Sequence, residues 1–126
     1  MQALTSEWVT KAEGDFVTAR RELRARVLPN YDAACFHAAQ CAEKYFKARL
    51  QEANIAFPRT HDIAALLALT LAVEPTWSTM MADARLLSVL SVDVRYPGIT
   101  ADKQLARDAF NASSQVRQAV RQSLNI

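Results

Sequence analysis

The chain has few of the residues that break regular structure or cross-link a fold. Its 126 residues include only 2 glycines, 4 prolines and 2 cysteines. Because short strands are joined by turns rich in glycine and proline, this scarcity argues against a protein of many strands. Two cysteines exclude a disulfide scaffold, and a composition of 51% hydrophobic and 22% charged residues excludes disorder. The length then fits a single domain, residues 1–126, with a core of its own.

Two further absences bear on location and on metal chemistry. No apolar run approaches the roughly 20 residues that span a bilayer, and the first residues lack the basic and then apolar blocks of a signal peptide. We therefore expect a cytoplasmic protein with no membrane partner. Cys35 and Cys41 lack the Cys-x-x-Cys spacing, and no histidine is placed to complete a zinc set. We predict that both are reduced and buried, and we expect no metal and no cofactor.

Proline divides the chain into five segments, and each segment has the apolar spacing of an amphipathic helix. We predict helices over residues 6–27, 31–53, 61–73, 77–94 and 101–124. Polar residues that follow the prolines are predicted to cap new helices: Asn30, Thr60, Thr76 and Thr100. Because short connections make successive helices antiparallel, the sequence predicts an all-α fold. We expect a five-helix, largely antiparallel up-and-down bundle with one short crossing helix.

A polar stripe follows the second predicted helix. His37, Gln40, Lys44 and Lys47 recur at spacings of three and four, and Glu43 forms an i, i+4 pair with Lys47. A solvated helix face would show the same pattern, and its salt bridge would be worth only a few tenths of a kcal/mol. The stripe is therefore a candidate binding surface, with a plain surface as the alternative.

Two shorter polar clusters lie near helix ends. Capping explains Thr60 and Asp62 but leaves Arg59 and His61, which offer a guanidinium and a titratable imidazole to an anion. At the end of the fourth predicted helix come Arg95 and Tyr96, followed by ordinary stop residues. The end of the first predicted helix is also strongly basic: Arg20, Arg21, Arg24 and Arg26. Such a group suits RNA phosphates, a soluble surface and a helix C-terminus equally.

Three segments in this order resemble the HEPN domain family. They are YDAACFHAAQCAEKYFKA at residues 31–48, FPRTHDI at residues 57–63 and RYPG at residues 95–98. The resemblance implies a helical bundle that forms homodimers. It also implies that the chain, like many prokaryotic members, acts with a separate minimal nucleotidyltransferase, in some pairs as toxin and antitoxin.

Many HEPN proteins are metal-independent endoribonucleases, whose usual motif is an arginine followed four to six positions later by a histidine. Arg95 is the nearest counterpart in position, but no histidine follows it. Cleavage needs one group to accept the proton of the ribose 2′-hydroxyl and another to donate one to the leaving oxygen. His61 could replace the missing histidine only if the fold, or a dimer partner, brings it near Arg95.

The sequence thus leaves three hypotheses. The first, which we favour, is a nucleotide- or RNA-binding module that acts with a nucleotidyltransferase. Its predicted ligand-binding residues are His37, Gln40, Glu43, Lys44, Lys47, Arg59, His61, Arg95 and Tyr96. The second is a ribonuclease toxin with an unusual site formed by Arg95 and His61. The third is a noncatalytic interaction protein that associates through the apolar faces of its third and fifth helices.

Overall fold

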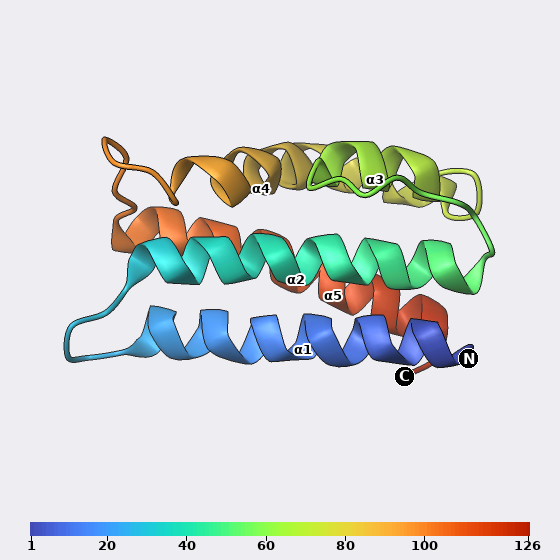
Figure 1. The fold of residues 1–126 in the computed structure, drawn as a ribbon, viewed down its shortest axis with the longest axis horizontal. Helices are drawn as coiled ribbons and strands as arrows, with labels where there is room; N and C mark the ends of the chain where they lie inside the picture. The colour runs from blue at the N-terminus through green and yellow to red at the C-terminus, as the bar shows by residue number, and fades with distance from the viewer.

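The computed structural model describes all 126 residues and contains helices but no strand. The elements are α1 (Ala3–Arg24), α2 (Tyr31–Glu52), α3 (Ile63–Thr70), the 3-10 helix η1 (Pro75–Met80), α4 (Met81–Asp93) and α5 (Lys103–Leu124). Figure 1 shows α1, α2, α4 and α5 along one long axis, with successive long helices running in opposite directions and both termini at one end. The predicted all-α, five-helix bundle is confirmed.

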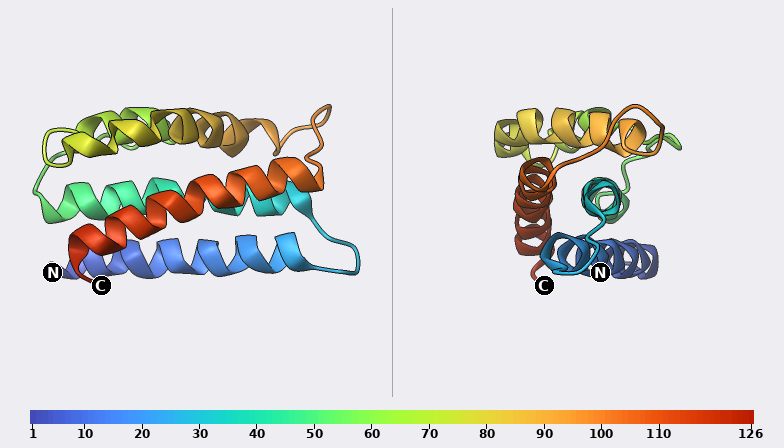
Figure 2. Two further views of the ribbon diagram at one scale, coloured as in Figure 1. Left: turned by 180° about the vertical axis from the view of Figure 1, so that it is seen from behind. Right: turned by 90° about the vertical axis from the view of Figure 1, so that its left-hand side faces the viewer.

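Helix α2 is the centre of the bundle and contacts α1, α3, α4 and α5. Small side chains along its first half are completely buried, among them Ala34, Cys35 and Ala38, so neighbouring helices can approach closely. Farther along, Tyr45 and Phe46 fill the wider space between the helices. Figure 2 shows, from behind, α5 crossing this central helix on the side opposite to the one seen in Figure 1.

The helix boundaries differ from the predicted ones where a different residue provides the cap. Asn30 caps α2 as predicted, since its side chain accepts from the backbone N–H of Ala33. For α3 and α5, however, the caps are Asp62 and Asp102, and each accepts from the N–H three residues later. The predictions for Thr60, Thr76 and Thr100 were therefore wrong: Thr60 accepts instead from the N–H of Asp62, and η1 has no side-chain cap. The third and fifth helices begin later because a carboxylate two residues farther along takes the capping position.

The first helix is also shorter than predicted. It ends at Arg24, so Val27, the last residue of the predicted helix, lies in a loop with 81% of its surface exposed. Beside it, Leu28 has a φ of 47°, a left-handed conformation that cannot continue a helix. The predicted fourth helix, residues 77–94, is likewise divided. Its first residues belong to the 3-10 helix η1, which begins at Pro75, and α4 begins only at Met81.

The two cysteines are free and buried, as predicted. Burial raises the pKa of Cys35 to about 11 and that of Cys41 to about 12. Both thiols therefore stay protonated at neutral pH and serve as small core side chains. None of the helices has the length and apolar character needed to cross a membrane.

Candidate functional site

One side of α2 gathers residues from three other parts of the chain. Phe36, Gln40, Glu43 and Lys47 recur at spacings of four, three and four, so they lie along one side of the helix, here called the α2 face. Three side chains from other segments reach it. Arg95, just after α4, lies over Phe36; His61, from the linker before α3, bonds to Glu43; and Trp8, from α1, lies over Lys47.

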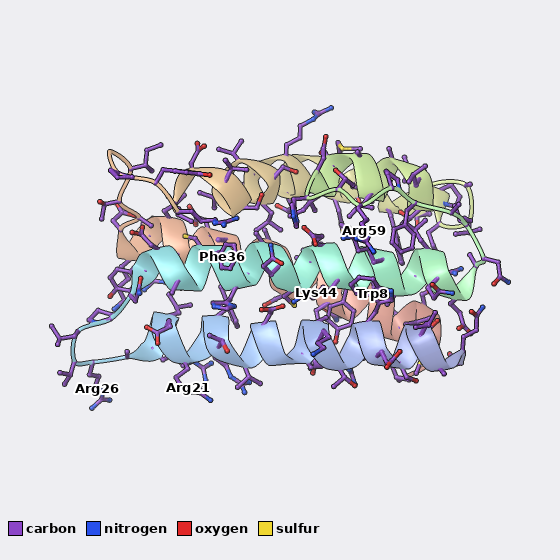
Figure 3. The ribbon with its side chains drawn as sticks, viewed as in Figure 1. Trp8, Arg21, Arg26, Phe36, Lys44 and Arg59 are labelled. Carbon is purple, nitrogen blue, oxygen red and sulfur yellow. The ribbon has the colours of Figure 1, made fainter.

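In Figure 3 the labelled side chains of Trp8, Phe36 and Arg59 lie on the side of the molecule where α1 and α2 run in front of α5. The linker that carries Arg59 leaves the end of α2 and crosses in front of α3 on this side. The α2 face is thus bordered by α1 along one edge and by this linker and the end of α4 along the other. Segments distant in sequence meet here, as the hypothesis of a single charged surface requires.

Glu43 is the centre of the α2 face. Its carboxylate accepts a bond of 3.1 Å from Nζ of Lys47 and lies 2.8 Å from Nδ1 of His61. The Glu43 side chain is only 3% exposed, whereas that of His61 is 71% exposed. Because the carboxylate favours the tautomer with the proton on Nδ1, the other ring nitrogen, Nε2, can accept a proton or a hydrogen bond from a ligand.

Lys47 is held on two sides and is nearly buried. Its ammonium group bonds to Glu43 and lies 5.3 Å from the centre of the Trp8 ring. A buried ammonium needs such partners, because leaving it unpaired away from water is costly. The charge of Lys47 is therefore compensated by Glu43, and the side chain is not free to wrap around a ligand.

Asp15 of α1 binds two further residues of the polar stripe. Its carboxylate lies 2.8 Å from Nδ1 of His37 and accepts a bond of 2.6 Å from Nζ of Lys44. Asp15 itself is buried. In Figure 3, Lys44 lies between α1 and α2, away from the edge that carries Arg59. His37 and Lys44, both predicted to bind a ligand, are thus engaged in joining two helices.

A third carboxylate, Glu13, connects α1, α2 and α5. It accepts two bonds from the Arg117 guanidinium, at 2.7 and 2.8 Å, and one from the Tyr45 hydroxyl at 2.5 Å. The hydrogen bonds from Arg117 hold the pKa of Glu13 below its ordinary value of 4.5, against the opposing effect of burial. This cluster lies between helices and serves to fix their packing.

The remaining predicted residues have free polar groups. Arg59, Arg95 and Tyr96 are exposed, and neither arginine forms an ion pair within the chain. The Arg95 guanidinium lies 5.4 Å from the centre of the Phe36 ring, which holds it over the α2 face. Gln40, between Phe36 and Glu43, is half-buried. These residues, with Nε2 of His61, are the part of the predicted set that a ligand can reach.

The structure brings His61 and Arg95 to the same face but not into contact. Their partners on α2, Glu43 and Phe36, are separated by seven residues, or about 10 Å along the helix axis. That spacing is short enough for both side chains to contact one nucleotide.

A cavity of about 420 Å³ adjoins the α2 face, and its walls include Trp8, Phe57 and Lys11. The rings of Trp8 and Phe57 meet edge to face, with centres 6.2 Å apart. Helical periodicity does not reveal this cavity, because Trp8 is spaced as a member of the buried series of Ala12, Phe16 and Ala19, whereas its ring is half-buried and borders the cavity. In the sequence, Trp8 indicates a cavity only together with Phe57, which lies far from it along the chain.

Taken together, these features define a small helical domain with a charged face over its central helix. The chain contains no group of three side chains that could hold a metal ion. A family model for the HEPN domain matches residues 5–123, nearly the whole chain, and the protein therefore belongs to the HEPN family. The resemblance found in the sequence is confirmed.

Two solved structures share this fold. The crystal structure of TT1696 from Thermus thermophilus has a TM-score of 0.84 at 19% identity, over 96% of this chain and 98% of that one. The structure of ST0689, described as an archaeal HEPN homologue, has a TM-score of 0.74 at 26% identity, over 98% of each chain. No curated protein matches the sequence.

Proposed function

We propose that this HEPN protein is a nucleotide- or RNA-binding module, and that the α2 face with the adjoining Trp8 cavity is its binding site. The observation that carries the proposal is the position of Trp8. Its ring lies over Lys47, which is bonded to Glu43, and it also forms a wall of the neighbouring cavity. An aromatic surface therefore adjoins the positive charges of the α2 face, the combination that recognises the base and the phosphates of a nucleotide.

The cavity suits the base. Trp8 and Phe57 offer aromatic surface, and Gln51 at the cavity wall offers both a hydrogen-bond donor and an acceptor. Stacking of a base on an aromatic side chain is worth about 1–3 kcal/mol and tolerates any base. A site of this kind would bind nucleotides with any base and would show no preference for one RNA sequence.

The exposed cations suit the phosphates. Arg59 and Arg95 form no ion pair within the chain, and a guanidinium can bind two phosphate oxygens at once. His61 adds Nε2, held toward solvent by the buried Glu43 carboxylate. Lys44 and Lys47, by contrast, already form ion pairs with Asp15 and Glu43, so they add little to phosphate binding.

Calorimetric titration of the full chain with ATP tests this proposal. We expect binding by the wild type, and a loss of about tenfold in affinity for Arg59→Ala, the size expected for one charge-assisted contact. Arg85→Ala is the matched control, since Arg85 is also exposed and unpaired but lies on α4 outside both the face and the cavity. No binding by the wild type at millimolar ATP would contradict the nucleotide half of the proposal.

The proposal includes a partner. A prokaryotic HEPN protein is expected to act with a minimal nucleotidyltransferase, in some pairs as toxin and antitoxin, and to form a homodimer. Two exposed valines of α4, Val89 and Val92, support the homodimer. With His61 they border a cavity of about 450 Å³. Light scattering on the purified protein, and on Val89→Asp, tests the dimer. Co-purification with a nucleotidyltransferase encoded beside it tests the pair.

A ribonuclease is the second candidate, and the contact between Glu43 and His61 favours it. A carboxylate that fixes a histidine by Nδ1 leaves Nε2 placed to act as a general base. Expression of the wild type would then arrest growth, and both His61→Ala and Arg95→Ala would relieve the arrest. A harmless wild type that leaves RNA intact without its partner would exclude the ribonuclease.

A further inference from the structure

A second basic cavity lies at the end of the bundle where α1 ends and α2 and α5 begin. It has a volume of about 690 Å³, and its walls carry four cations and an aromatic ring: Arg24, Arg26, Lys103, Arg107 and Tyr31. No acidic side chain lines it. Figure 2 shows, from behind, the start of α5 at the same end of the molecule as the loop between α1 and α2.

None of these four cations has an acidic partner, in contrast to the cations inside the bundle. Lys44, Lys47 and Arg117 each form an ion pair with a carboxylate. The acidic residues near the basic cavity form no ion pair with these cations. Asp102 caps α5, Glu22 accepts from the N–H of Asn30, and Asp32 accepts from the N–H of Ala101. The four cations that line the cavity therefore have no direct acidic partner within the chain.

Helix stability explains only one of these four cations. Arg24 lies in the last turn of α1, where a cation is favourable because the helix C-terminus is partly negative. Lys103 is the first residue of α5, where the helix end is partly positive and a cation is unfavourable. Arg26 lies beyond the end of α1 and Arg107 beyond the first turn of α5, so neither stabilises a helix end. Four cations around one cavity, three of them with no role in helix stability, favour a bound anion.

We propose that this cavity binds the phosphate groups of an RNA strand, as a second site apart from the α2 face. Arg24, Arg26 and Arg107 can each grip phosphate oxygens in a forked contact, and Tyr31 can stack a base. Tyr31 and Glu43 are separated by 12 residues of α2, about 18 Å along the axis. A mononucleotide is too short for both sites, whereas an RNA strand can occupy the two together.

The test is the binding of a labelled 12-nucleotide single-stranded RNA, measured by fluorescence anisotropy over a series of KCl concentrations. Arg107→Glu and Arg85→Glu are the matched variants, because both residues are exposed, helical and free of ion pairs, and both substitutions change the charge equally. We expect Arg107→Glu to weaken binding by about tenfold or more and to reduce the salt slope by about 1–2. Arg85→Glu should stay within about twofold of the wild type.

Equal weakening by both variants would overturn the proposal, since it would show diffuse attraction without a site. Absence of RNA binding by the wild type at low salt would also overturn it. If the wild type instead sediments with vesicles of anionic phospholipid and binds no RNA, the ligand is a lipid and the RNA assignment is wrong. Far-UV circular dichroism confirms the fold of Arg107→Glu, in which the new carboxylate suits the start of a helix.

ATP titration separates this site from the one under "Proposed function". If Arg107→Glu loses RNA but retains ATP affinity, both sites are supported. If Arg59→Ala loses ATP while Arg107→Glu binds RNA like the wild type, the α2 face stands and the basic cavity is excluded. If Arg107→Glu loses ATP as well, the basic cavity is a phosphate site and the nucleotide site proposed on the α2 face is wrong.

Discussion

Glu43 and His61 lie 2.8 Å apart although one side chain is 3% exposed and the other 71% exposed. A carboxylate inside the bundle thus orients an imidazole outside it. The same carboxylate also holds the ammonium group of Lys47, so the position of His61 depends on a buried ion pair. Any change at Glu43 should therefore affect both the stability of the fold and the geometry of the α2 face.

The buried pair of Glu43 and Lys47 should show strong coupling. Glu43→Ala leaves the Lys47 ammonium without its acidic partner, and we expect a loss of about 3–5 kcal/mol in the free energy of unfolding. The double variant Glu43→Leu with Lys47→Met removes both charges and should lose much less, because similar volumes of apolar side chain replace the pair. Urea denaturation of the wild type, Glu43→Leu, Lys47→Met and the double variant measures the coupling. Additive losses would show that the pair does not interact.

Glu13 should give the protein a dependence on acid. Because hydrogen bonds from Arg117 lower its pKa below 4.5, its contribution to stability is fully present above pH 4.5 and is lost as the pH falls through the lowered value. Glu13→Gln should cost about 1–2 kcal/mol at pH 7, near the lower end for charged hydrogen bonds because the side chain is 31% exposed. Denaturation from pH 7 to pH 3 should show the wild type and the variant converging in acid. A constant difference would contradict the assignment.

The two thiols should be unreactive in the folded protein. With pKa values raised to about 11 and about 12, Cys35 and Cys41 contain almost no thiolate at pH 8. We expect iodoacetamide to label both more than about 100-fold more slowly in the native protein than in urea. Mass spectrometry of timed samples measures the two rates. Rapid labelling of one native cysteine would show that the contacts of α2 open locally.

The fold could be predicted from the sequence because every long helix has a continuous apolar stripe, and α2 in particular has small residues at each buried position of its first half. The helix ends were less predictable. Thr60 and Asp62 both follow Pro58 and both are good caps, and the sequence does not show that Asp62 caps the helix and that Ile63, after it, is part of the core.

The partners of the polar stripe could not be predicted from one sequence. His37 and Lys44 are seven residues apart and therefore share a side of α2, but the pattern does not show that Asp15 lies opposite them. The signal was present on α1, where Asp15 interrupts a buried series that includes Ala12, Phe16 and Ala19. An acidic residue on an apolar face implies a cationic partner. Its identity depends on the register between two helices.

The most direct test of the nucleotide site uses the two tryptophans of the chain. Trp8 borders the proposed base cavity, whereas Trp77 is buried against Phe46. Each gives a separate indole N–H signal in a ¹H–¹⁵N spectrum, so Trp77 serves as an internal control during titration with ATP. The account predicts a saturable shift of the Trp8 signal with little change at Trp77, and a weaker response in Arg59→Ala. Binding of ATP that leaves the Trp8 signal unmoved would contradict it.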